Sequence, residues 1–310
     1  MTLKILFSAR DGLWDDYEAH LAEALAEKSL QAEVVLEADP DEVDYIVFAP
    51  NGPVSDFTSY TNTKAVLGLW AGVEDIVTNA TLTQPLTRMV DPGLAQGMAE
   101  WVCGHVLRHH LGLDEDVLRR AGDWTVRVPP LAQDRTVAIL GMGELGSKAA
   151  EGLHALGFNV VGWARSAKSD APVPVSFGED GLQEVLATAD ILVLLLPLTP
   201  DTENLINAEA LSGMKRGAVL INPGRGALID DDALIAALDE GQIGHATLDV
   251  FRQEPLPERH PFWAHPKVTV TPHIASATRP STASMVIAEN IRRAEAGENL
   301  LYLVDRSAGY

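Results

Sequence analysis

The sequence is poor in cysteine, in basic residues and in long apolar runs, and each shortage excludes a class of protein. Cys103 is the only cysteine among 310 residues, so no disulfide can form within the chain, which is typical of a reducing compartment. The 23 lysines and arginines are outnumbered by 44 acidic residues, and the resulting formal net charge of −21 argues against nucleic acid and anionic membranes as partners. The longest apolar run, Ile191–Leu196, is far shorter than the roughly 18 residues that a membrane-spanning helix needs.

What remains is typical of a globular protein of about two domains. The first residues, MTLKILFSARDG, do not resemble a secretion signal, because their apolar stretch is short and acidic residues follow it. We therefore expect a cytoplasmic location. We interpret Cys103, which lies in an apolar helical stretch, as a structural thiol rather than as a nucleophile.

Short apolar runs alternate with amphipathic stretches almost throughout, which is typical of parallel α/β sheets. In the first hundred residues we expect strands at Leu3–Ser8, Val34–Glu37, Tyr45–Ala49 and Ala65–Leu69, helices at about Trp14–Lys28 and Leu94–Leu111, and a loop-rich stretch at Asn79–Gly93. The pattern then restarts with expected strands at Thr136–Leu140, Asn159–Trp163, Ile191–Leu196, Ala218–Ile221, His245–Val250 and Val268–Thr271, and helices near Leu145–Leu156, Leu182–Ala187, Asp231–Glu240 and Thr282–Ala296. This second block predicts a complete doubly wound sheet.

A glycine-rich loop follows the first strand of that block. The segment Thr136–Gly146 reads TVAILGMGELG, a strand that leads into G-x-G-x-x-G and then a helix. In such loops the first glycine (Gly141) permits the tight turn, the second (Gly143) lets the backbone approach a pyrophosphate, and the third (Gly146) lets the helix pack close to its strand. The helix N-terminus then offers N–H groups to phosphate. We predict a dinucleotide site here, with a purely structural turn as the alternative.

The end of the next strand indicates which dinucleotide binds. An acidic residue there would accept a hydrogen bond from the ribose 2′-hydroxyl of NAD, but Ala164 stands at that position. Arg165, Ser166 and Lys168 follow at once, and these cationic and hydroxyl groups suit a 2′-phosphate. We predict NADP(H) in preference to NAD(H); the alternative is a solvated basic turn.

Three later segments carry groups suited to hydride transfer to a carbonyl. Each follows a predicted strand, at the edge where open α/β sheets bind their ligands. Arg225, in N-P-G-R-G, is able to grip a 2-keto acid and polarise its carbonyl. His273, in T-P-H-I-A-S, is able to supply the proton, and Glu254, in D-V-F-R-Q-E-P, would fix its tautomer and stabilise the protonated ring. Singly, each residue also has a structural interpretation, as a loop cap, a surface acid or a histidine at a strand end.

Other residues with potential chemistry give weaker signals. His105, His109 and His110 lie on the long predicted helix without the acid or cysteine spacing of a metal site, so we predict no metal. Thr199 follows the strand Ile191–Leu196 and either touches the cofactor or forms a local turn.

Together these motifs resemble the D-isomer-specific 2-hydroxyacid dehydrogenase family over nearly the whole chain. The resemblance implies that Arg225 binds the substrate, that His273 is the acid/base with Glu254 as its partner, and that Asp249 lies near the nicotinamide amide. Two departures are the missing NAD-type aspartate at Ala164 and the Pro223-Gly224 pair before the arginine. We expect the cofactor site to include Gly141, Met142, Gly143, Glu144, Leu145, Gly146, Ala164, Arg165, Ser166, Lys168, Leu196, Pro197, Thr202, Pro223, Gly224, Asp249, His273 and Ala275.

The same resemblance predicts the fold. It implies two Rossmann-like, doubly wound parallel-sheet domains, with the dinucleotide-binding domain inserted into a flavodoxin-like substrate domain. We expect the substrate domain to span residues 1–99 and 278–310 and the cofactor domain to span residues 100–277. A homodimer is also implied, with the helix Leu94–Leu111 and its flanks at the interface.

Within the family, the N-terminal half resembles the glyoxylate/hydroxypyruvate reductase A branch, through G-L-W-A-G-V-E-D from Gly68 and P-L-T-R-M-V-D-P-G from Pro85. This branch prefers NADPH, which agrees with the basic segment after Ala164. The likeness implies that the N–H groups of Ala71 and Gly72 bind the substrate carboxylate. Trp70 and Arg88 either wall the pocket or are structural.

We therefore expect an NADPH-dependent reductase of glyoxylate and hydroxypyruvate. A dehydrogenase of a bulkier keto acid is the first alternative. A formate-type enzyme fits less well, because Glu254 stands where a glutamine would be expected. A dinucleotide-sensing binding protein of the same fold is the remaining alternative.

Overall fold

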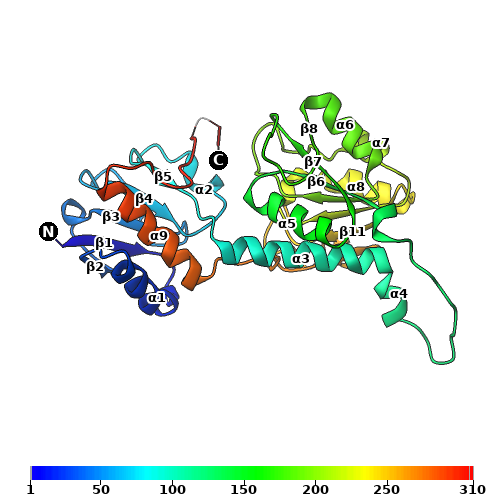
Figure 1. Cartoon of the computed structure of the whole chain (residues 1–310), viewed down its shortest axis with the longest axis horizontal. Helices are drawn as coiled ribbons and strands as arrows, with labels where there is room; N and C mark the ends of the chain where they lie inside the picture. Colours follow the sequence, from blue (N-terminus) through cyan, green and yellow to red (C-terminus); the bar gives the residue numbers. More distant parts are fainter. Residues whose placement is uncertain (1, 307, 310) are drawn as a thin grey trace. The chain divides into compact units, whose positions relative to one another are not determined.

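The computed structural model describes residues 2–306, 308 and 309, and the chain divides into two compact units (Figure 1). The first comprises Met1–Leu94 and Ala277–Tyr310, and the second comprises Ala95–Ser276. The second unit is therefore an insertion within the first. The chain crosses from one unit to the other between residues 94 and 95 and again between residues 276 and 277; the boundaries expected from the sequence were 99/100 and 277/278.

The first unit is built on a five-stranded parallel sheet in the order β2-β1-β3-β4-β5, the flavodoxin-like order. Helices α1 and α9 lie side by side against this sheet and share a core with β1, β3 and β4 (Figure 1). The elements are β1 Leu3–Ser8, α1 Leu13–Glu27, β2 Ala32–Val35, β3 Tyr45–Phe48, β4 Ala65–Gly68, α2 Glu74–Val77, β5 Leu86–Thr87 and α9 Pro280–Glu295, with a 3-10 turn at Pro40–Glu42.

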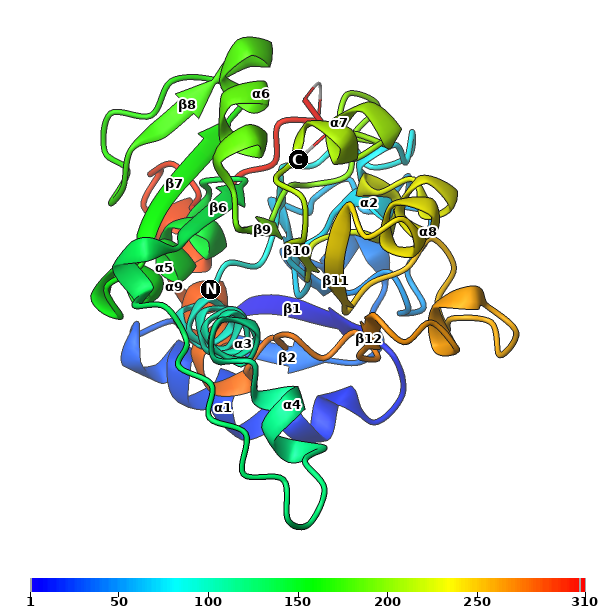
Figure 2. The same ribbon diagram turned by 90° about the vertical axis from the view of Figure 1, so that its right-hand side faces the viewer.

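The second unit holds a seven-stranded parallel sheet in the order β12-β11-β10-β9-β6-β7-β8 (Figure 2). Its strands are β6 Thr136–Leu140, β7 Asn159–Ala164, β8 Val175–Phe177, β9 Ile191–Leu194, β10 Ala218–Asn222, β11 Ile243–Leu248 and β12 Val268–Val270. Its helices are α3 Pro92–Leu111, which begins just before the crossing, α4 Leu113–Val117, α5 Glu144–Ala155, α6 Gly178–Thr188, α7 Ala208–Gly213 and α8 Asp231–Asp239, with 3-10 turns at Ala132–Asp134, Gly226–Leu228 and Pro261–Trp263. Both sheets confirm the predicted doubly wound, Rossmann-like class.

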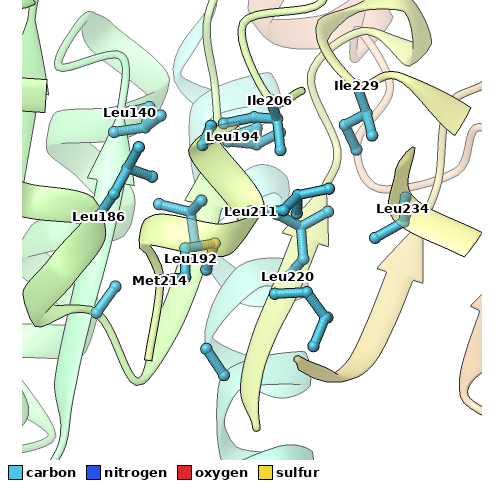
Figure 3. Close-up of a cluster of buried hydrophobic side chains, with 14 of the residues drawn as sticks. Leu140, Leu186, Leu192, Leu194, Ile206, Leu211, Met214, Leu220, Ile229 and Leu234 are labelled. Atoms are coloured by element: carbon cyan, nitrogen blue, oxygen red, sulfur yellow. The ribbon is translucent and has the colours of Figure 1, made fainter. Parts of the chain in front are cut away.

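Alternate residues of β6 pack on opposite faces of this sheet. Ala138 and Leu140 join a cluster with α6, α7 and α8 (Figure 3), whereas Val137 and Ile139 join a cluster with α3 and α5. Side chains of a strand point alternately to the two faces, so a strand covered on both sides is apolar at every position. This is why the strands of the second unit read as short continuous apolar runs.

Several short elements were not expected from the sequence: β5, β8, α2, α4 and α7. A strand of two or three residues, such as β5 or β8, or a helix of one turn shows no periodicity, and tertiary pairing stabilises it. The register of β2 is a related case. Residues Leu3–Leu6 of β1 pair with Ala32–Val35, so β2 spans Ala32–Val35 instead of the expected Val34–Glu37.

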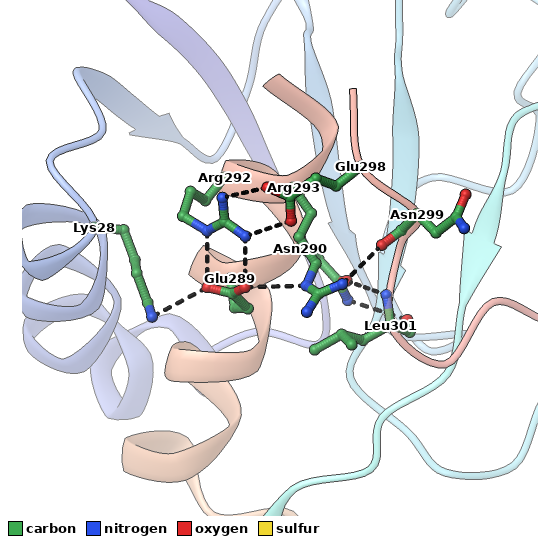
Figure 4. A network of polar contacts seen from close by, with 8 residues as sticks. All are labelled: Lys28, Glu289, Asn290, Arg292, Arg293, Glu298, Asn299 and Leu301. Carbon is green, nitrogen blue, oxygen red and sulfur yellow. Dashed lines mark hydrogen bonds and ion pairs between the residues drawn. The ribbon is translucent and has the colours of Figure 1, made fainter. Parts of the chain in front are cut away.

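Glu289 on α9 is the centre of a charged network that ties α9 to the end of α1 (Figure 4). Its carboxylate lies 2.9 Å from Arg292, 3.0 Å from Arg293 and 3.1 Å from Lys28. The hydrogen bond from Arg292, with further ones from Lys28 and Arg293, lowers the pKa of Glu289 to about 2. The ionised carboxylate therefore favours the folded state.

We expect this network to make the protein less stable in acid. A carboxyl whose pKa is lowered by folding stabilises the fold above its ordinary value of 4.5, and that contribution is lost as the pH falls from there toward 2. Glu289→Gln should lower the free energy of unfolding by about 1 kcal/mol at pH 7, because the pairs are near the surface, and by much less near pH 2. Urea unfolding across this pH range measures the difference. Glu23→Gln, on the exposed side of α1, is the control; an equal loss in both variants would contradict the prediction.

No helix among residues 2–306, 308 and 309 is both long enough and apolar enough to cross a membrane.

Candidate active site

The predicted catalytic residues follow three neighbouring strands of the second unit. Arg225 follows β10, Glu254 lies in the loop after β11, and His273 lies after β12. These strands are adjacent and parallel, so all three loops leave the same edge of the sheet. The sheet order therefore brings together groups that are up to 48 residues apart in the sequence.

Glu254 and His273 are in direct contact. The Nδ1 atom of His273 lies 2.7 Å from Oε2 of Glu254, and the other carboxylate oxygen accepts a hydrogen bond from the Phe251 N–H at 2.9 Å. The His273 side chain is 52% exposed. The carboxylate thus orients the ring through Nδ1 and leaves Nε2 for a reacting group.

The backbone of His273 has an unusual conformation that Asp249 holds in place. His273 has φ = 54°, a region that costs a residue with a side chain about 1–2 kcal/mol. Its N–H donates to the Asp249 carbonyl at 2.8 Å. The buried Asp249 carboxylate accepts hydrogen bonds from Thr271 Oγ1 at 2.6 Å, from the N–H of Ile274 at 2.9 Å and from the N–H of Ala275 at 2.8 Å.

In the structure the Asp249 carboxylate binds the loop that carries His273. The resemblance placed it near the nicotinamide amide, whereas each of these hydrogen bonds goes to the His273 loop. Contact between Asp249 and a cofactor stays a prediction. Thr271, the residue after β12, was not singled out as a partner in this loop; its place two residues before the histidine was the available signal.

Asn222, at the end of β10, folds the arginine loop. Its Oδ1 accepts the Gly224 N–H at 3.0 Å and its Nδ2 donates to the Arg225 carbonyl at 2.9 Å. The half-buried Arg225 directs Nη1 to the Gly224 carbonyl at 2.7 Å. Gly224 is required for packing, because a Cβ there would lie 2.8 Å from the Leu194 carbonyl oxygen. Asn222 was not among the residues predicted for the site, although it opens the N-P-G-R motif.

The glycine loop has the shape that a pyrophosphate needs. Gly141 has φ = 106°, a conformation that favours glycine. A Cβ on Gly146 would lie 1.9 Å from the Gly141 carbonyl oxygen, so the first turn of α5 packs directly on the backbone of the loop. A Cβ on Gly143 would meet nothing within 4 Å, which leaves the backbone open at the start of the helix. The first N–H groups of a helix have no partner within it, so those of α5 fit a phosphate.

The other proposed cofactor residues differ in their exposure and in the elements that carry them. Arg165, Ser166 and Lys168 are exposed in the segment directly after β7. Met142 instead packs into the core with α5, so only its backbone faces the loop. The hydroxyl of Thr202 donates to the Pro197 carbonyl at 2.7 Å and accepts the Thr199 N–H at 2.8 Å, which supports the local-turn alternative for Thr199; contact of Thr202 with the cofactor stays a prediction. Glu144 and Leu145 open α5, Ala164 ends β7, and Leu196, Pro223 and Ala275 are buried.

The proposed carboxylate-binding residues lie in the first unit. Trp70 is 39% exposed, and Ala71 and Gly72 follow it in the loop between β4 and α2. Arg88 follows β5, and the Met89 N–H donates to the Trp70 carbonyl at 2.8 Å, so the two loops lie side by side. Contact of these residues with a substrate stays a prediction.

Two further histidines of the second unit, His109 and His245, have structural surroundings. Burial lowers the pKa of His109 to about 3 and that of His245 to about 4, and their tilted rings lie 4.8 Å apart between centroids. Both stay neutral at pH 7 and bond to threonines, His109 to Thr247 and His245 to Thr269. No group of three or more histidine, cysteine or acidic side chains in the described part of the chain is arranged to hold a metal ion.

Known proteins with similar sequences and structures identify the family. The family model of the D-isomer specific 2-hydroxyacid dehydrogenases, NAD binding domain, matches residues 102–275, which is more than half of the chain. Glyoxylate/hydroxypyruvate reductase A of Serratia proteamaculans (strain 568) is 42% identical over 255 residues, covering 80% of this chain and 82% of that protein.

Two solved structures resemble the full chain. A D-isomer specific 2-hydroxyacid dehydrogenase from Xanthobacter autotrophicus Py2, in complex with NADPH and MES, is 40% identical with a TM-score of 0.92, and 100% of both chains is covered. The NADPH-dependent glyoxylate/hydroxypyruvate reductase of Sinorhizobium meliloti, in complex with NADP and sulfate, is 34% identical with a TM-score of 0.87, again over 100% of both chains. The resemblance of the motifs is thereby confirmed: this chain belongs to the family of D-isomer specific 2-hydroxyacid dehydrogenases.

Proposed function

We propose that this enzyme is an NADPH-dependent reductase of small 2-keto acids, converting glyoxylate to glycolate and hydroxypyruvate to D-glycerate. The observation that carries the mechanism is the 2.7 Å contact between Glu254 and His273 at the end of β12, next to the strand ends that bear the arginine loop. The substrate class rests on the relatives from Serratia proteamaculans and Sinorhizobium meliloti, which are glyoxylate/hydroxypyruvate reductases.

The residues divide the work of carbonyl reduction. When bound, the reduced nicotinamide supplies the hydride to the carbonyl carbon. Arg225 binds the keto acid and polarises its carbonyl, and His273 delivers a proton from Nε2 to the oxygen as negative charge develops there. The Glu254 carboxylate accepts the hydrogen bond from Nδ1 and thereby stabilises the charged ring before the transfer. One hydride and one proton thus convert the keto acid to the hydroxy acid.

The proposed cofactor preference rests on local cations. The two solved relatives are complexes with NADPH and NADP. With a formal net charge of −21 the chain exerts little long-range attraction on an anion, so charges near the site must capture the cofactor. Arg165 and Lys168, exposed after β7, would supply these charges.

Initial rates test the proposal. NADPH and NADH are each assayed with glyoxylate, hydroxypyruvate, pyruvate and phenylpyruvate. We expect the highest kcat/KM for NADPH with the two small acids. A preference for phenylpyruvate would be consistent with the proposed mechanism but would contradict the proposed small substrates. Tight NADPH binding without turnover of any acid would contradict the enzymatic proposal and favour a dinucleotide-sensing protein.

We propose a homodimer whose interface includes α3 and its flanks. After α4 the chain runs through residues 118–131 without helix or strand and projects from the rest of its unit (Figures 1 and 2). Arg127 donates to the Gly112 carbonyl at 3.0 Å at the base of this arm. The side chains of Trp124, Val126 and Val128 are 91%, 78% and 85% exposed. Exposed apolar side chains at alternate positions of an extended segment are typical of an interface.

Sedimentation velocity tests the dimer. The protein should sediment as a dimer, and Trp124→Glu combined with Val126→Glu should shift it to monomer, because both charges would be buried in the interface. Trp263→Glu, at a 52% exposed tryptophan elsewhere in the same unit, is the control. A monomeric native protein would contradict the proposal.

The single cysteine of the chain also leads us to propose a cytoplasmic location.

A further inference from the structure

Arg252 lies two residues before Glu254 and reaches across to the loop that follows Arg225. We propose that Arg252 is a positioning residue that locks the Arg225 loop to the Glu254 loop, and thereby sets the spacing between the substrate-binding guanidinium and the acid/base pair. This inference rests on the roles proposed for Arg225, Glu254 and His273.

The guanidinium of Arg252 contacts backbone on the far side of the arginine loop. Its Nη2 donates to the Ile229 carbonyl and lies 3.5 Å from the Ala227 carbonyl oxygen. Ala227 lies within the 3-10 turn Gly226–Leu228, which begins directly after Arg225, and Ile229 follows that turn. Arg252 is therefore bound to the turn that ends the Arg225 loop.

A third segment completes the attachment. Nη2 of Arg252 also donates to Oδ1 of Asn204, whose own N–H donates to the Ala227 carbonyl at 2.9 Å. Two carboxylates lie near the guanidinium, Glu203 at 3.8 Å and Asp231 at 3.7 Å. These ion pairs are partly exposed and contribute little by themselves. The planar guanidinium, which serves several acceptors in fixed directions, supplies the geometry.

The two loops already touch beside Arg252. A Cβ on Gly226 would lie 2.0 Å from the carbonyl carbon of Phe251, so the backbones are in contact at this point. Phe251 also donates its N–H to Glu254 at 2.9 Å. A continuous set of contacts thus runs from the turn after Arg225, through Phe251 and Glu254, to His273, and Arg252 holds its two loops together.

Loosening this connection should misplace the reacting groups without touching the cofactor loop. A displacement of about 1 Å between a substrate clamp and a proton donor can lower the rate by about 100-fold. We expect Arg252→Ala to lower kcat/KM for glyoxylate by about 10- to 100-fold. The Kd for NADPH should stay within about twofold, because the hydrogen bonds of Arg252 go to Asn204, Ala227 and Ile229, which lie outside the glycine loop and the segment after β7.

Arg252→Lys separates geometry from charge. Lysine keeps the positive charge but cannot serve several fixed acceptors with a planar fork. We expect Arg252→Lys to stay well below the native kcat/KM and the pH dependence of kcat/KM to shift in both variants, because Glu254 no longer holds the ring in one position. Full activity in Arg252→Lys would show that only the charge matters and would overturn the proposal.

Two controls make the outcomes distinct. Arg216→Ala removes another arginine of the same unit that donates to a backbone carbonyl, that of Glu240 at 2.8 Å, and should leave kcat/KM and the pH profile unchanged. The Tm of each variant shows whether it is folded at the assay temperature, and Arg252→Lys serves if Arg252→Ala is not. Native kcat/KM in a folded Arg252→Ala or Arg252→Lys overturns this inference alone, whereas native activity in His273→Ala overturns the proposed site.

Discussion

Replacing His273 with alanine should lower kcat for glyoxylate by about 10²- to 10⁴-fold, the usual contribution of a positioned proton donor. Without the imidazole, the developing alkoxide has to take its proton from water. The Kd for NADPH should change little, because His273 is only one of the expected cofactor contacts and the glycine loop and the basic segment follow other strands, β6 and β7. Steady-state rates and a fluorescence titration with NADPH measure the two quantities separately.

A second histidine of the same unit provides the control. His154→Ala removes an exposed imidazole from the last turn of α5, which is not one of the loops that carry the proposed catalytic residues, and should leave kcat unchanged. Glu254→Gln retains an amide oxygen for Nδ1 but loses the charge that stabilises the protonated ring, so we expect a loss smaller than that of His273→Ala. A His273→Ala variant with native kcat would disprove the acid/base role.

The double variant Arg165→Ala, Lys168→Ala should weaken NADPH binding by about 10- to 100-fold and leave NADH binding nearly unchanged. Hydrogen bonds to charged groups contribute about 1.5–3 kcal/mol each when sheltered. Both side chains are exposed, so we expect the two together to contribute less than two sheltered contacts would. Only NADPH carries the 2′-phosphate, so the ratio of the two Kd values isolates this contact. Isothermal titration with each cofactor measures the ratio.

Loss of net positive charge is the competing explanation for such an effect. Lys148→Ala, Lys215→Ala removes the same charge from exposed positions of the same unit and should leave the NADPH/NADH ratio unchanged. The effect of Arg165 and Lys168 should also shrink at high ionic strength, because the pairing is exposed. Equal weakening of NADPH and NADH in the Arg165, Lys168 variant would remove the 2′-phosphate assignment.

The sequence by itself determined the elements that depend on local pattern. The continuous apolar runs predicted β6 at Thr136–Leu140 with the bounds that the structure has, and the G-x-G-x-x-G spacing placed α5 to within one residue. Both follow from short-range rules: a strand buried on both faces must be apolar throughout, and the glycines are needed where backbone meets backbone. The set of motifs after the strands was specific enough to predict the family.

Only the tertiary structure decided which side chains meet. Spacing along the chain does not say that Nδ1 of His273 contacts Oε2 of Glu254, or that the buried Asp249 carboxylate binds the loop around the histidine. These contacts depend on β10, β11 and β12 being neighbours, which is a property of the sheet order. The reach of Arg252 to the turn after Arg225 depends on it as well. Local propensity acts over a few residues, whereas a site made by three loops exists only once non-local strand pairing has brought those loops together.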